Sequence, residues 1–122
     1  MIGRRHQRSR RPGARLPDGV VCATRGTVLG NPFRSDRFGH ARAVGLHRAW
    51  LDGRLGERTL RALGFNEHER AALERLRRRA LDRLAQLAGR DMACWCPLTS
   101  RWCHVDTLLD RAASMAPVGA AA

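Results

Sequence analysis

Short apolar runs along the chain predict strands. Residues 19–25 form an apolar, β-branched run that ends at Gly26, which is typical of a buried strand. Residues 90–96 form a second run, ended by Pro97. The pattern shows no further strand as clearly, so a third strand is expected either in residues 54–65 or in a partner chain.

Apolar residues spaced three or four apart predict the helices between and after these strands. The most regular stripe lies in residues 66–88, whose start has the residue pattern of a capping box. A helix over residues 36–52 and a short one over 57–63 precede it, and a last helix covers residues 104–114. This order predicts the α/β class, as a small single domain with a short parallel sheet flanked by helices.

The predicted topology also predicts the place of a binding site. In a parallel sheet, ligands bind beyond the carboxyl ends of the strands. Residues 25–33 follow the first strand, and residues 96–106 follow the second. If the two strands are neighbours, both segments lie at one edge of the sheet, and we expect the site there.

Arginine dominates the charge of the chain. Its 23 basic residues include no lysine, and the formal net charge is +12. Because this bias is typical of GC-rich coding, the charge alone is weak evidence for a nucleic-acid partner. Residues 1–15 are rich in arginine and contain no acid, and we expect them to form a mobile arm. The arm either binds nucleic-acid phosphates or mainly adds solubility. Its candidate contact residues are Arg4, Arg5, Arg8, Arg10 and Arg11.

Length and hydropathy predict one domain between two short ends. At 122 residues the chain is long enough for one domain and too short for two full ones. The arm is followed by a domain over residues 16–114 and a frayed tail over 115–122. No apolar run approaches the roughly 20 residues of a membrane span, and none follows the basic start as in a secretory signal. We therefore expect a cytoplasmic protein without a membrane partner, whose thiols are reduced.

Metal-binding and nucleophilic side chains concentrate in residues 94–104. Cys94 and Cys96 alternate on the second strand, so they face the same side about 7 Å apart. With Cys103 and His104 they would form a Cys₃His zinc site. The adjacency of Cys103 and His104 disfavours this four-ligand set, because the side chains of two adjacent residues diverge in most backbone conformations. The alternative for Cys94 is a small buried hydrophobic residue. Trp95 is expected to pack in the core, with stacking on a base as the alternative.

The same residues also suit a reactive site. At the start of the last helix the pKa of Cys103 would be lowered, and His104 beside it would complete a nucleophile–base pair. Asp106 lies in the first helical turn, where an acid also stabilises the helix dipole without any other role. Cys96, Cys103, His104 and Asp106 are the candidate catalytic residues, and the sequence leaves open whether the protein is an enzyme.

The loop after the first strand is the other side of the expected site. Gly30 permits a tight bend, and Pro32 favours an extended Asn31. Asn31 either hydrogen-bonds a ligand or holds its own loop in an Asx turn. Arg25 either binds a phosphate or carboxylate or is simply exposed. The candidate ligand-binding residues are Arg25, Gly30, Asn31, Pro32 and Phe33.

Three motifs together resemble one known family. They are GNPF at residues 30–33, GRDMACWCPL at 89–98 and CHVDTLL at 103–109. The chain resembles the domain-of-unknown-function family 4326 over roughly residues 13–113, with departures at Trp102 and Val105. The resemblance implies an origin in bacteria or actinobacterial phages, and thus the bacterial or host cytoplasm. It implies no particular reaction.

Two functions agree with these features. In the first, which we favour, the α/β domain binds or acts on a nucleotide-like or phosphorylated ligand between the GNPF loop and the cysteine segment. In the second, the protein is a zinc-stapled interaction module whose arginine-rich arm binds nucleic acid. The cofactor expectation is therefore open, with zinc as the candidate.

Overall fold

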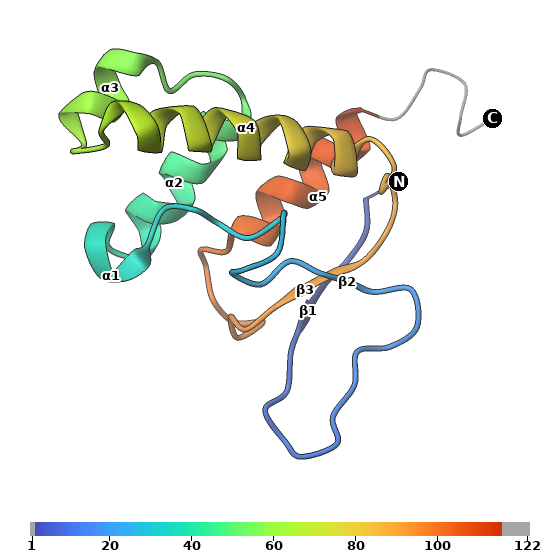
Figure 1. Ribbon diagram of the computed structural model, residues 1–122. Helices are drawn as coiled ribbons and strands as arrows, with labels where there is room; N and C mark the ends of the chain where they lie inside the picture. The colour runs from blue at the N-terminus through green and yellow to red at the C-terminus, as the bar shows by residue number, and fades with distance from the viewer. Residues whose placement is uncertain (1, 116–122) are drawn as a thin grey trace.

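A short parallel sheet lies beneath a layer of helices in the computed structural model, which describes residues 2–115 (Figure 1). The α/β class predicted from the sequence is confirmed. The elements are β1 (Arg5–Gln7), β2 (Val21–Cys22), α1 (Ser35–Phe38), α2 (His40–Leu51), α3 (Glu57–Ala62), α4 (Glu67–Leu84), β3 (Met92–Cys94) and α5 (His104–Ser114). Within the described residues no helix is long and apolar enough to cross a membrane.

The sheet has the order β1-β3-β2, and both pairs are parallel. The two strands expected from the sequence, β2 and β3, are neighbours, and each is shorter than its apolar run. The Ala23 N–H donates to the Ala93 carbonyl at 2.8 Å, just past the end of β2. Because β2 and β3 are parallel, the segments that follow them leave the sheet at the same edge.

The third strand lies in the segment expected to be a mobile arm, and that expectation is wrong for β1. Arg5 pairs with Met92, and Gln7 pairs with Cys94. The Arg8 N–H also donates to the Cys94 carbonyl at 2.7 Å. An edge strand is held mainly by backbone hydrogen bonds, so a low apolar content does not prevent it from pairing. Residues 54–65, the expected place of this strand, contain α3 instead.

Glycine divides the first predicted helix. Instead of one helix over residues 36–52, α1 ends at Phe38 and α2 begins at His40. Gly39 between them has φ +81°, a left-handed conformation that interrupts a right-handed helix. At the break, Phe38 packs against Phe33 and Phe65. The centroid of the Phe38 ring lies 6.3 Å from that of each of these two rings. The helix predicted over 66–88 ends earlier, as α4, whereas α5 has the predicted bounds.

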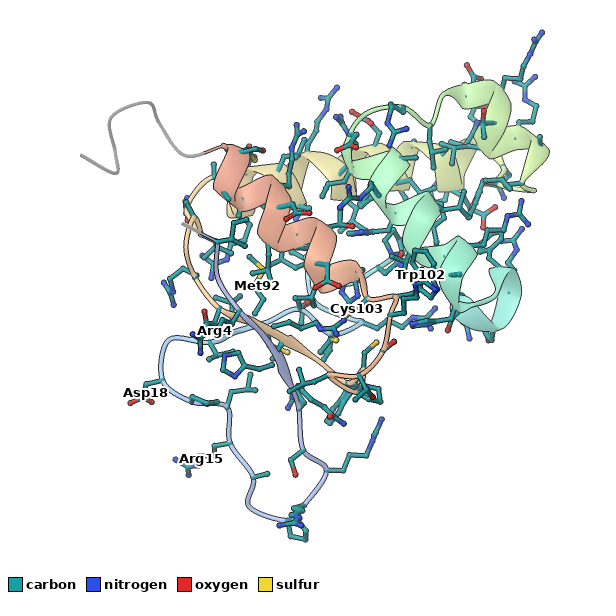
Figure 2. All side chains as sticks on the ribbon, turned by 180° about the vertical axis from the view of Figure 1, so that it is seen from behind. Arg4, Arg15, Asp18, Met92, Trp102 and Cys103 are labelled. Carbon is teal, nitrogen blue, oxygen red and sulfur yellow. The ribbon has the colours of Figure 1, made fainter. Side chains whose placement is uncertain are left out.

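The core lies between the sheet and α2, α4 and α5. Met92 of β3 is fully buried and lies beneath α5 (Figure 2). Phe33 packs edge-on against Trp50 and Phe65, with ring centroids 6.0 and 5.9 Å apart. Apolar burial of this kind is the main term that stabilises the domain. The frayed tail predicted for residues 115–122 lies, apart from Met115, outside the described residues.

Candidate functional site

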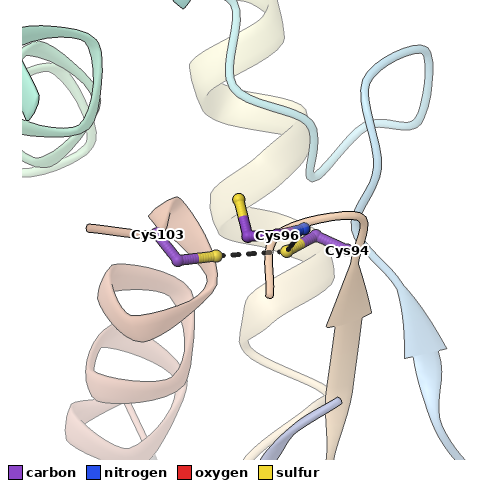
Figure 3. Close-up of side chains that lie close together, drawn as sticks. All are labelled: Cys94, Cys96 and Cys103. Atoms are coloured by element: carbon purple, nitrogen blue, oxygen red, sulfur yellow. Dashed lines mark hydrogen bonds between the residues drawn. The ribbon is translucent and has the colours of Figure 1, made fainter. Parts of the chain in front are cut away.

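Three cysteines meet where β3 ends and α5 begins. Cys94 is the last residue of β3, Cys96 follows two residues later, and Cys103 immediately precedes α5. Their sulfur atoms all lie within 4.8 Å of one another. Cys94 and Cys103 are in hydrogen-bond contact, with 3.1 Å between their sulfurs (Figure 3). These three side chains, which we call the cysteine cluster, can hold a metal ion.

The thiols of the cysteine cluster differ in acidity. The pKa of Cys103 is lowered to about 3, chiefly because the Cys94 thiol donates a hydrogen bond to its sulfur. The nearby His104 side chain, the Val105 N–H and the Arg5 guanidinium lower the pKa of Cys103 further, and together these effects outweigh its burial. The pKa of Cys94 is raised, because its proton is held in the bond to Cys103 and because it is buried. Burial also raises the pKa of Cys96. The cluster thus favours one thiolate, at Cys103.

Arg5 holds the loop that joins two of these cysteines. Its guanidinium donates to the carbonyls of Leu98 and Ser100 at 2.9 and 3.0 Å. The same group lies 3.4 Å from the Asp106 carboxylate. A residue of β1 therefore positions the segment between Cys96 and Cys103, a role that the prediction of a mobile arm did not include.

A cavity of about 220 Å³ adjoins the cysteine cluster. It lies where the segments after β2 and β3 meet the first residues of α2 and α5. The residues that line it are Thr24, Arg25, Asn31, Phe33, Arg34, Ser35, His40, Ala43, Val44, Cys94, Trp95, Cys96 and His104. The structure thus brings together the GNPF loop and the cysteine segment, as the parallel topology predicted.

A wider hollow lies elsewhere, between β2 and α4. Its volume is about 730 Å³, and its lining includes Arg79, Arg83 and Arg90. It shares no lining residue with the smaller cavity, and it contains none of the cysteine cluster. We place the candidate site at the smaller cavity, because the nucleophilic and metal-binding side chains face it.

The GNPF loop is built by its own hydrogen bonds and by the core. The Asn31 Oδ1 accepts a hydrogen bond from the Phe33 N–H at 2.9 Å, which is an Asx turn, and Nδ2 donates to the Ala43 carbonyl at 3.1 Å. A Cβ at Gly30 would lie 2.7 Å from the Thr24 carbonyl oxygen. Pro32 is half-buried and lies outside the lining. Asn31 therefore holds the loop in place, and it also lines the cavity.

His104 lines the cavity and is not part of the cysteine cluster. Its Nε2 lies 2.7 Å from the Ala23 carbonyl oxygen, and because a carbonyl only accepts, this nitrogen donates. Cys103 before it has an extended backbone with φ −153°, whereas His104 is the first residue of α5. The sulfur cluster contains three ligands rather than the four of the predicted Cys₃His set.

Asp106 does not reach the cavity. It is exposed on the first turn of α5 beside Arg5. Burial of part of the side chain raises the pKa of its carboxyl, although Arg5 opposes this shift. Of the four candidate catalytic residues, Cys96 and His104 line the cavity, Cys103 belongs to the adjoining cluster, and Asp106 belongs to neither.

Sequence reasoning missed His47 of α2 beside the site. The ring is buried, and its centroid lies 5.4 Å from that of His104 in an edge-to-face contact. Burial lowers the pKa of His47 to about 3, and the neighbouring His104 and Arg48 add to the effect. The signal in the sequence was its position on the apolar side of the helix, four residues after Ala43.

The cavity has an electropositive lining. His40 is the first residue of α2 and His104 is the first of α5, so the positive ends of two helix dipoles meet there. Arg34 is paired with Asp36 through two hydrogen bonds of 3.0 and 2.9 Å. Among the residues that the structure describes, exposed Arg25 forms no ion pair. Its guanidinium is therefore available to an anion in the cavity.

Trp95 is exposed, and the prediction that it packs in the core is wrong. It is 36% exposed, and it lines the edge of the cavity. The guanidinium carbons of Arg8 and Arg10 lie 4.5 and 4.2 Å from its ring centroid, at cation–π distance. Because β3 ends at Cys94, the chain leaves the sheet before Trp95 and turns this ring outward.

The fold and the site define a small α/β domain with a cysteine cluster and an adjoining cavity at the carboxyl edge of a parallel sheet. The chain belongs to the family described as Domain of unknown function (DUF4326), whose pattern matches residues 6–114. The match begins within β1, so part of this strand belongs to the family domain. No curated protein and no solved structure matches the chain.

Proposed function

We propose that this protein binds a small anionic molecule, nucleotide-like or phosphorylated, in the cavity beside the cysteine cluster. The observation that carries the proposal is that one cavity is lined by the GNPF loop, by the cysteine segment and by the starts of α2 and α5. Residues 24–35 and 94–104 are far apart in the chain, and the parallel sheet brings them to one edge.

The charge of the lining favours an anion. Arg25 provides a guanidinium without a protein partner among the described residues, and guanidinium binds phosphate or carboxylate through paired N–H groups. The starts of α2 and α5 add two helix N-termini, which favour negative charge. Phosphorylated molecules combine this charge with a polar or aromatic body that can contact Asn31 and Trp95.

The volume of the cavity limits what it encloses. Pockets for drug-sized ligands usually begin at about 300 Å³, whereas this cavity has about 220 Å³. We expect one sugar-phosphate or base moiety inside the cavity, with any larger part of the ligand outside it near Trp95.

Isothermal titration calorimetry with AMP, ribose 5-phosphate and inorganic phosphate tests this proposal. We expect at least one of the three to bind, and Arg25→Ala to weaken that binding about tenfold or more, the effect of losing a charge-assisted contact. Arg75→Ala is the matched control, because Arg75 is exposed on α4 away from the cavity. The proposal fails if none of the three probes binds, or if both variants bind as the unchanged protein does.

A second candidate function, nucleic-acid binding, is favoured by the stacking of Arg8 and Arg10 on Trp95. Both guanidiniums lie on an exposed aromatic ring next to the cavity, where they can contact phosphates while the ring edge contacts a base. Removal of residues 1–15 would also remove β1, so point substitutions are the better test.

Fluorescence anisotropy with a single-stranded oligonucleotide at several salt concentrations tests this second function. We expect the Arg8→Gln/Arg10→Gln protein to bind more weakly, with a salt slope reduced by about one to two. Arg75→Gln/Arg79→Gln, on exposed positions of α4, is the control for loss of charge alone. An equal effect of both double variants would contradict a site at Trp95.

A further inference from the structure

We propose that the cysteine cluster binds one zinc ion through three thiolates, and that the fourth coordination position opens into the cavity. This inference rests on the proposed function, because the bound ligand or a water molecule would occupy that position. Three protein ligands with an open fourth position are the arrangement of zinc sites that bind substrates, whereas structural zinc sites are closed by four protein ligands.

The distances between the sulfurs suit zinc. Zn–S bonds of about 2.3 Å in a tetrahedron place neighbouring sulfurs about 3.8 Å apart. The three sulfurs already lie within 4.8 Å of one another, and the pair at Cys94 and Cys103 is 3.1 Å apart. Small side-chain rotations bring all three to the tetrahedral distance, and Figure 3 shows the three thiols around a common space.

The backbone that carries the ligands is well supported. Cys94 is in the central strand and Cys103 is at the start of α5, so both come from regular elements. Arg5 holds the intervening loop through the carbonyls of Leu98 and Ser100. A Zn²⁺ with three thiolates has one net negative charge, which the nearby Arg5 guanidinium and the N-terminus of α5 compensate.

The fourth position is left to a ligand from the cavity. The cavity lining includes Cys94 and Cys96 but not Cys103, so the cluster meets the cavity on the side of the first two. His104, the residue nearest in sequence that can bind zinc, is not among the described side chains whose ligand atoms lie within 4.8 Å of one another. An anionic oxygen of the ligand is a suitable fourth donor for zinc.

Elemental analysis of the full chain, purified under reducing conditions with zinc present, tests the ligand set. We expect one zinc ion per chain, lost in Cys96→Ser and in Cys103→Ser. Cys22→Ser is the matched control, because Cys22 lies outside the cluster, and it should keep its zinc. His104→Gln should also keep it, which separates this set from Cys₃His. Circular dichroism identifies which variants are folded.

Metal-free protein that is folded would overturn the inference, as would folded Cys96→Ser with a full zinc content. Loss of zinc in folded His104→Gln would overturn the three-thiolate set. The half-buried position of Cys96 makes its serine variant the one most readily compared as a folded protein.

Cobalt substitution tests the open position. The visible bands of Co²⁺ bound to the cluster should change when inorganic phosphate or 2-mercaptoethanol is added, because either probe can enter the fourth position. Unchanged bands with both probes would overturn an open site. Elemental analysis and calorimetry on the same preparation separate the two proposals. Protein that contains no zinc but binds ribose 5-phosphate rejects the zinc site alone. Protein that contains zinc but binds none of the phosphate probes rejects the proposed function.

Discussion

At the scale of single residues, His47 is the buried group that most affects the response to acid. Its ring is 1% exposed between Trp50 and His104, and within the described structure its Nδ1 has no hydrogen-bond partner. Burial holds its pKa at about 3, with His104 and Arg48 as the neighbouring titratable and charged groups. Burial of a neutral imidazole without a hydrogen-bond partner lowers the stability of the folded protein. The loss grows at acidic pH, where the unfolded chain can protonate this ring and the folded protein cannot.

The first prediction follows from the lowered pKa of His47. The unfolded chain binds a proton at this residue below pH 6.5, whereas the folded protein does so only near pH 3. Stability should therefore fall as pH decreases from 6.5 toward 3, by at most about 1.4 kcal/mol per pH unit from this group. Urea unfolding at pH 7, 5.5 and 4.5 should show this loss, and His47→Leu should lose less between pH 7 and 4.5.

Equal losses in the unchanged protein and in His47→Leu would show that other groups cause the acid response. His47→Gln provides a second non-titrating variant of similar polarity, in case leucine packs poorly in the edge-to-face contact with His104.

Two glycines give a second prediction at this scale. A Cβ at Gly30 would lie 2.7 Å from one backbone oxygen and 2.8 Å from the Arg25 Cα, so Gly30→Ala should force the GNPF loop to move. Gly45 lies within α2 with open space around its Cα. Gly45→Ala should stabilise the protein by up to about 1 kcal/mol through helix propensity, whereas Gly30→Ala should destabilise it by about 1–3 kcal/mol. Thermal unfolding of both variants checks the opposite signs, and a stabilised Gly30→Ala would contradict the close approach.

At the scale of elements, β1 is the segment that the sequence concealed. Backbone hydrogen bonds to β3 flank its three residues on both sides. The Met92 N–H donates to the Arg4 carbonyl at 3.0 Å, and the Arg8 N–H donates to the Cys94 carbonyl at 2.7 Å. It also brings Arg5 to the loop before α5. An arginine-rich stretch without an apolar stripe has no pattern that predicts this pairing, because the bonds are made by the backbone.

Removal of residues 1–8 should therefore destabilise the fold rather than only reduce its charge. Loss of the two backbone bonds at the ends of β1, and of the Arg5 contacts, should cost at least about 2 kcal/mol of unfolding free energy. Arg10→Gln/Arg11→Gln removes two arginines outside β1 and is the control. If the urea midpoints of both proteins fall equally, this segment affects stability through its charge and not through strand pairing.

The start of α4 and both ends of α5 were predicted well from the sequence. Asn66 and Glu69 form both bonds of a capping box, at 2.8 and 2.9 Å, as their spacing indicated. The break at Gly39 was missed, because glycine is compatible with a weak helix as well as with a left-handed turn. Local hydrogen bonds are encoded by neighbours in sequence, whereas the choice at Gly39 depends on where Phe38 packs.

At the scale of the whole molecule, the net charge of +12 sets the response to salt. The ion pairs in the described residues are mostly exposed, as at Arg61 and Glu57, and such pairs contribute little. Repulsion among the excess arginines therefore outweighs them, and screening should relieve it. We expect the melting temperature to rise by a few degrees between 20 and 200 mM NaCl, measured by differential scanning calorimetry. A fall over the same range would show that the ion pairs dominate.

The apolar pattern by itself determined the α/β class, the main helices and the two strands β2 and β3, because burial and local hydrogen bonding depend on the spacing of residues in the chain. It also identified both segments that line the cavity beside the cysteine cluster. Only the tertiary structure decided that Arg5–Gln7 completes the sheet, that His104 turns to the Ala23 carbonyl and that Asp106 faces solvent. These outcomes depend on contacts between residues more than 80 positions apart, or on which side of a helix meets the core, and no local pattern records either.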